Sequence, residues 1–247
     1  MIKKIFFVIT FLIFSFIRIH AQSFGFGCLG LVGGYGGYSY QQYQPGMLND
    51  FVNDFNTAAT DKLNQFGKAD GYRFGLNFFR ADFSGFFVTA KGYYQQLGES
   101  HSAQNTGRDG PVNYDFDLTL KSWGIGFDVG IPILSVINWK ILDGTILINS
   151  ARFTSTSNSL LGTFVQKFNN EKTEIGYSLG SGFVIDVIKN YISIEGIAAY
   201  SYLKIDKMET DDNIKFSEIF SPTDDNPPFI KSGGFNAVIQ LNVGFPL

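Results

Sequence analysis

The last fifteen residues, "GGFNAVIQLNVGFPL" (233–247), alternate between apolar and polar positions. The apolar set is Phe235, Ala237, Ile239, Leu241, Val243 and Phe245, with Asn236, Gln240, Asn242 and Gly244 between them, and only Val238 breaks the polar set. Because successive side chains of a β-strand point to opposite faces, this stretch predicts a strand with one apolar and one polar face. The apolar face could be buried in a soluble sandwich or could face lipid in a membrane barrel.

The N-terminus predicts export. Lys3 and Lys4 precede an apolar run from Ile5 to Ile17, and Ala21 follows a short exit, which together predict a secretory signal peptide over 1–21 and a mature domain over 22–247. Removal of this segment takes three basic residues and no acidic one, so the net charge falls from −3 to −6. An acidic exported chain lacks the basic stripe that nucleic-acid binding requires. The lone Cys28 excludes an intrachain disulfide.

Eight strand-like stretches follow one another in the mature chain, and no stretch of 18 consecutive apolar residues predicts a membrane helix. The stretches cover 23–40, 71–79, 83–97, 113–131, about 138–155, 173–188, 191–205 and 233–247. Short connections alternate with four long ones at 41–70, 98–112, 156–171 and 205–228. Short turns on one rim and long loops on the other are typical of an outer-membrane barrel.

One strand departs from simple alternation. In 113–131 the apolar phase changes between Leu120 and Trp123. A β-bulge near 121–123 would explain the change. The alternative is that the upper half of the strand lies outside the membrane, where the phase is weakly enforced.

The signal ending "HAQS", the alternating strands and the C-terminal "FNAVIQLNVGF" resemble the small eight-stranded outer-membrane barrels of the OmpA transmembrane-domain and OmpX type, a porin-family group of Gram-negative bacteria. The resemblance covers the mature chain and rests on architecture. It implies an all-β fold: one eight-stranded antiparallel up-and-down transmembrane β-barrel with long external loops, both chain ends periplasmic, and a place in the cell outer membrane.

The polar faces of the strands predict the barrel interior. The expected inward set is Arg73, Asn77, Lys91, Asp128, Asp186, Glu195, Asn236, Gln240 and Asn242. Because burying an isolated charge in such an interior costs on the order of several kcal/mol, these charges are expected to pair. Arg73 and Lys91 would face Glu195 and Asp128 in a structural plug. The alternative is a narrow porin-like path for small polar solutes or ions.

Residues 46–68 break the β pattern and predict an amphipathic helix in the first external loop. Its apolar face would comprise Leu48, Phe51, Val52, Phe55, Leu63 and Phe66. This face could cap the barrel mouth or dock a partner protein or the outer leaflet.

The sequence predicts no enzyme, no cofactor and no metal site. His101 lies between Ser100 and Ser102, and adjacent residues rarely form a nucleophile and its base. We expect a structural or surface-interaction protein whose partners are outer-membrane lipid and a protein at the external loops, present as a monomer or in a membrane complex. The remaining alternative is a soluble lipocalin-like carrier with the apolar faces turned inward.

Overall fold

The computed structural model describes residues 31–107, 110–189, 191–220 and 227–246, so the expected signal peptide, Cys28 and the beginning of the first expected strand lie outside the described residues. The elements, in chain order, are β1 (Leu31–Pro45), α2 (Met47–Ala58), β2 (Lys68–Phe83), β3 (Phe86–Gly107), β4 (Gly110–Pro132), β5 (Ile137–Ser159), β6 (Gly162–Asn170), β7 (Glu174–Ile188), β8 (Ile192–Tyr202), β9 (Met208–Glu209), α3 (Phe216–Phe220) and β10 (Ile230–Pro246).

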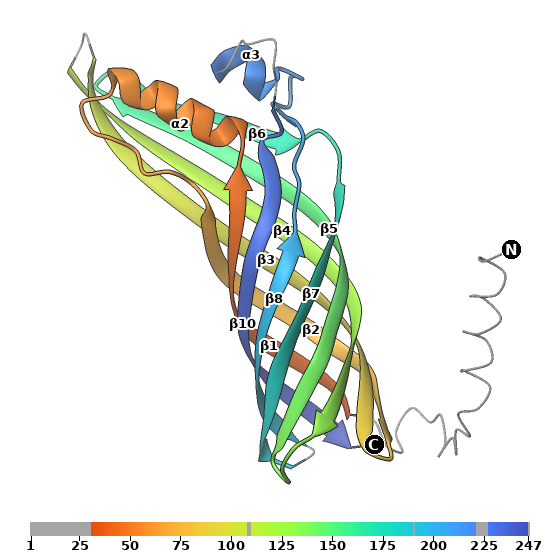
Figure 1. Cartoon of the computed structure of the whole chain (residues 1–247). Helices are drawn as coiled ribbons and strands as arrows, with labels where there is room; N and C mark the ends of the chain where they lie inside the picture. The colour runs from red at the N-terminus through yellow and green to blue at the C-terminus, as the bar shows by residue number, and fades with distance from the viewer. Residues whose placement is uncertain (1–30, 108–109, 190, 221–226, 247) are drawn as a thin grey trace, which may run out of the picture.

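Eight of these strands close into an antiparallel barrel (Figure 1). Their order is β4-β3-β2-β1-β10-β8-β7-β5, and pairing of β4 with β5 closes the ring. The first and last strands pair along their length, from Leu31 with Pro246 to Pro45 with Ile230. The eight-stranded up-and-down barrel expected from the sequence is confirmed.

Two of the expected long loops are instead strands. Residues 98–107 and 110–112 continue β3 and β4, and most of 156–171 belongs to the β5–β6 hairpin. These segments resembled loops because their outward side chains are small and polar. Ser100 and Ser102 face outward and bond Asp117 and Asp115 on β4 at 2.5 and 2.7 Å. The upper parts of β3 to β6 therefore form a sheet that projects beyond the other strands (Figure 1), here named the external extension.

The register of β4 explains the change of phase in its sequence. Pairing with β3 is unbroken from Phe87–Gly130 to Gly107–Gly110, so the bulge expected near 121–123 is wrong. The inward positions run without interruption from the apolar Phe116 and Leu120 to Ser122 and Asp128. The apolar side chains thus point inward in the external extension and outward below it.

Below the external extension the outward face of the barrel is made largely of exposed apolar side chains, a surface here named the lipid belt. Its exposed members include Phe74, Leu76, Trp123, Ile125, Phe127, Ile146, Ile148, Ile175, Leu179, Phe183, Ile185, Ile194, Ile239, Leu241 and Val243. This is the reverse of the arrangement that a soluble carrier requires. In the part of the chain that is described, no helix has the length and apolar character needed to cross a membrane.

The core of the external extension is aromatic. Phe153 on β5 is fully buried, and its ring centroid lies 6.0 Å from Phe51 of α2, 5.6 Å from Phe216 of α3 and 5.8 Å from Phe229. Both helices lie at this end of the molecule, opposite the end where the chain terminates (Figure 1). The apolar inner faces of β3 to β6 therefore pack on the two helices.

Candidate functional site: the barrel interior and its external cap

Five charged side chains meet inside the barrel at the depth of the lipid belt, here named the ion cluster. Lys140 Nζ lies 2.6 Å from Asp128 Oδ2 and also pairs with Glu195. Lys91 pairs with Asp143 and lies 3.8 Å from Asp128. All five side chains are at most 5% exposed. Each charge therefore has an opposite partner, which offsets the cost of its burial.

The alternation of the sequence did not predict that Lys140 and Asp143 both face the interior, because residues three apart in a regular strand lie on opposite faces. In β5 a register shift occurs between them, and Ile141 is left without a partner on β4. Such a bulge places two residues opposite one and turns both charges inward. Strict alternation would have put them on opposite faces. The one available signal was the presence of two charges beside the apolar Trp139, Ile141 and Leu142.

Arg73 lies inside the barrel but pairs with no carboxylate of the described residues, contrary to the expected pairing with acidic residues. Its Nε and Nη2 donate to Gln95 Oε1 at 2.9 and 2.6 Å. Its guanidinium lies 4.0 Å above the ring of Tyr93. An aromatic face and an amide oxygen thus take the place of the carboxylate.

The inward amides extend this polar interior. Gln240 Nε2 donates to Glu195 Oε2 at 3.2 Å, and Asn242 Nδ2 donates to the same oxygen at 3.1 Å. Nearer the external end, Asn236 Nδ2 donates to Gln41 Oε1 at 3.1 Å. Gln240 and Asn242 thus orient the Glu195 carboxylate, whose other oxygen pairs with Lys140.

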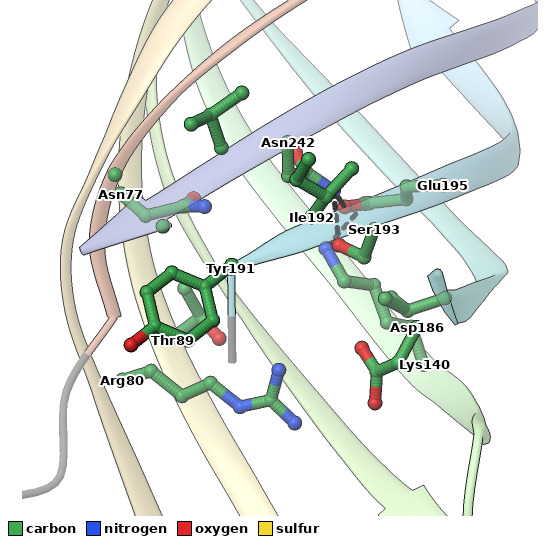
Figure 2. A pocket seen from close by; sticks show the side chains of 14 residues that line it. Asn77, Arg80, Thr89, Lys140, Asp186, Tyr191, Ile192, Ser193, Glu195 and Asn242 are labelled. Carbon is green, nitrogen blue, oxygen red and sulfur yellow. Dashed lines mark hydrogen bonds and ion pairs between the residues drawn. The ribbon is translucent and has the colours of Figure 1, made fainter. Parts of the chain in front are cut away.

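The lower mouth of the interior contains Asn77 and Asp186, both half-buried. Asp186 Oδ2 accepts a 3.3 Å bond from Asn138 Nδ2. Both side chains line a cavity of about 40 Å³ that reaches Lys140 and Glu195 (Figure 2). This volume accommodates a few water molecules.

A second cavity of about 20 Å³ lies above the ion cluster and is bordered by Arg73, Gln95 and Asn149. Along β3, Thr89 lines the lower cavity, Lys91 belongs to the ion cluster, and Gln95 lines the upper cavity. The charged layer therefore lies between the two cavities.

The expected helix is shorter than its sequence pattern. α2 ends at Ala58, with Leu48 and Val52 fully buried, Phe51 buried and Phe55 half-buried against the aromatic core.

Leu63 and Phe66 follow the helix in an extended return segment, yet both are buried in the same core. Asn56 of α2 exchanges two hydrogen bonds with the backbone of Leu63, at 2.8 and 3.0 Å. Asn49 does the same with Phe66, at 3.0 and 3.2 Å. Two asparagine side chains thereby hold the return segment against the helix.

The entry into α2 requires a glycine. Gly46 N donates to Phe229 O at 2.9 Å, and a Cβ at this position would lie 1.9 Å from Pro228 O. The strand–helix junction therefore packs directly on the backbone that leads into β10.

Glu99 anchors the end of the return segment. Its carboxylate accepts the backbone N–H groups of Gly67 and Lys68 at 3.0 and 2.9 Å, and the hydroxyl of Tyr43 also donates to it. Burial, followed by the charge of Glu99, raises the pKa of Tyr43, which lies above the lipid belt. The phenol therefore remains a donor throughout the neutral range.

His101 is a neighbour of this anchor. Its Nε2 lies 3.0 Å from Glu99 Oε1, and its ring packs edge-on to Phe66 with centroids 4.5 Å apart. Ser100 and Ser102 point to the opposite face of β3, where they bond aspartates of β4. His101 and its flanking serines thus do not converge.

Replacing Glu99 with alanine is expected to free the return segment while the barrel below stays folded. The amides of Gly67 and Lys68 lose a charged acceptor, so their hydrogen exchange should quicken at least about tenfold. Hydrogen exchange of the refolded protein measures this change. Replacement of Glu171, an exposed acid directly after β6, should leave both amides unchanged.

No protein-family model and no curated protein matches the chain. Among solved structures it is similar to Ail, the attachment invasion locus protein of Yersinia pestis, at 12% identity and a TM-score of 0.39, over 88% of this chain and 99% of that one. It is also similar to Neisserial surface protein A at 11% identity and a TM-score of 0.40, over 86% and 97% of the two chains. Outer membrane protease OmpT from Escherichia coli matches at 11% identity and a TM-score of 0.40, over 87% and 95%.

The class of the protein follows from its own barrel. A closed ring of antiparallel strands, an apolar outer belt and a polar, paired interior define an integral β-barrel protein of the outer membrane. The short turns and the end of β10 lie at the rim opposite the external extension (Figure 1). In outer-membrane barrels the short turns are periplasmic and the long connections external.

Proposed function

We propose that this protein is a closed outer-membrane barrel with a structural or surface-interaction role, in which the ion cluster acts as a plug. The observation that carries the proposal is the layer of Lys91, Lys140 and their three acidic partners between two small cavities. The interior of an eight-stranded barrel is just wide enough for its own side chains.

The cap, formed by α2, the return segment 59–67 and α3 on the aromatic core, supports the same proposal. The apolar face of α2 is turned into the aromatic core and is not available for docking. A protein partner at the external loops would therefore meet the polar side of α2, where Asn53 and Asp54 are exposed. Partner binding is thus assigned to the outer surface of the cap, and no catalytic role is assigned to His101.

Conductance across a planar bilayer tests the plug. The wild-type protein is expected to give no current steps, and Glu195→Ala is expected to give none either while unfolding at a lower temperature. The reason is that Lys140 keeps Asp128, and the aromatic core still closes the external end. Ion-selective steps in the wild type that change in Glu195→Ala would instead support the narrow channel.

A further inference from the structure

The outer wall of the barrel has a groove of about 810 Å³ within the lipid belt, here named the side groove. It crosses β1 to β5, and its side walls include Phe74, Phe78, Tyr94, Trp123, Ile125 and Ile146. Its lining is almost wholly apolar. The volume lies in the range of pockets that hold a small ligand.

Outward-facing glycines make this part of the wall hollow. Gly34, Leu76 and Gly92 are neighbours across β1, β2 and β3, so two of three adjacent outward positions have no side chain. Phe78 is the extra residue of a bulge in β2, and its ring leans over Gly92, where a Cβ would lie 2.8 Å from Cζ. The groove therefore has a glycine floor and an aromatic edge.

Directly above the groove stands a row of polar outward residues. Tyr72, Gln96 and Lys121 are cross-strand neighbours on β2, β3 and β4. Lys121 stands about 13 Å along β4 from Ile125 of the groove. In the described part of the chain it forms no ion pair, whereas Lys204, at the same rim of the barrel, is paired with Asp206 at 2.6 Å.

Gln96 completes the polar row. Its carbonyl accepts a 3.1 Å bond from the Tyr94 hydroxyl, which directs its amide N–H groups away from that contact. The ring of Tyr94 in turn packs against Trp123, with centroids 5.0 Å apart. A cation, amide donors and a phenol thus stand over an apolar groove at the outer membrane interface.

We propose that the side groove and Lys121 together bind one phosphate-bearing lipid of the outer leaflet. One acyl chain lies in the groove over Gly34 and against the Phe78 ring that covers Gly92, and the headgroup phosphate contacts the Lys121 ammonium and the neighbouring donors. The charge and the groove are complementary to the two ends of such a lipid. This site lies on the outer wall and does not depend on the plug.

Native mass spectrometry tests the site. The protein is refolded into phosphatidylcholine nanodiscs containing lipid A, a bis-phosphorylated multi-acyl lipid. The protein is then released from the nanodiscs, and the lipid A that stays bound to it is measured across a series of lipid A concentrations. Lys121→Gln is expected to weaken retention about fivefold through loss of one interfacial charge. Gly34→Leu fills the groove without a clash, since its Cβ meets atoms only at 3.9 Å, and should weaken retention about threefold.

Matched controls exist for both changes. Gly196→Leu adds the same side chain at an open outward position of β8, and Lys204→Gln removes a paired lysine of the same rim. Both should retain lipid A as the wild type does. If Gly34→Leu does not show the heat-dependent gel shift of a folded barrel, Trp123→Leu tests the groove by lowering a wall.

The outcomes separate cleanly. Equal retention by Lys121→Gln and Gly196→Leu, or equal retention of lipid A and its dephosphorylated form by the wild type, would overturn the proposal. A loss caused by Lys121→Gln but by neither groove variant would overturn the assignment of the acyl chain. The proposal requires that Lys121→Gln and the groove variant both retain less lipid A, and that both controls retain as much as the wild type.

Discussion

Replacing Lys140 with methionine is expected to lower the free energy of unfolding by about 3–5 kcal/mol. Lys140 contacts both Asp128 and Glu195 inside the barrel, and both carboxylates are buried. Without the ammonium these two negative charges remain in the barrel interior with Lys91 as the one nearby cation of the ion cluster. Urea unfolding of the protein in lipid vesicles, followed by heat-dependent gel mobility, measures the change.

Two further variants check this reasoning. Lys204→Met removes a lysine from an exposed pair with Asp206, and should change stability by less than about 1 kcal/mol. Adding Glu195→Gln to Lys140→Met removes one of the uncompensated charges and should recover part of the loss. Equal stability of Lys140→Met and Lys204→Met would contradict the role of the ion cluster.

Replacing Phe153 with alanine is expected to lower the stability of the external cap by about 3–5 kcal/mol and to leave the membrane barrel unaffected. The ring is fully buried between both helices and the inner faces of the extension, so its removal leaves a cavity there. The lipid belt is not touched, and the heat-dependent gel shift should persist. Limited proteolysis of intact cells should then cut within the return segment 59–67.

Phe164 on β6 provides the control, because it lies on the same hairpin and is 65% exposed. Phe164→Ala should leave the cap as resistant to protease as the wild type. Loss of the gel shift in Phe153→Ala would show that the cap and the membrane barrel unfold together, against the local effect expected here.

The membrane part of the fold could be predicted because lipid enforces alternation there. In β10, Phe235, Ile239 and Leu241 face outward while Asn236 and Gln240 face inward, as their sequence pattern indicates. The phase change in β4 could not be interpreted from its own sequence. It needed the knowledge that the external extension has an apolar interior, supplied by α2 and α3 from distant parts of the chain.

The interior could be predicted only in part, for a similar reason. Lys91 and Asp128 follow regular alternation, whereas the bulge at Ile141 brings Lys140 and Asp143 inward against it. Sequence alternation carries no information about a bulge, whose position depends on the pairing of both neighbouring strands.

The helix face shows the limit of periodic patterns. Leu63 and Phe66 continue the helical spacing of Leu48 and Val52, but they reach the core from an extended segment. Their position depends on hydrogen bonds from asparagine side chains, and such long-range contacts have no periodic signature.

Single-cysteine scanning of β4 in lipid vesicles tests the central claim most directly, with Cys28 replaced by serine. Cysteines at 123, 125 and 127, labelled with a fluorophore, should be quenched by a lipid-borne quencher, while those at 115 and 117 should react with a water-soluble maleimide. Positions 116, 118 and 120 should do neither in the folded protein, because they face the aromatic core. Lipid quenching at 116, 118 and 120 would show that these apolar side chains face outward. It would contradict the inward-facing apolar side of the external extension and favour a bulge near 121–123.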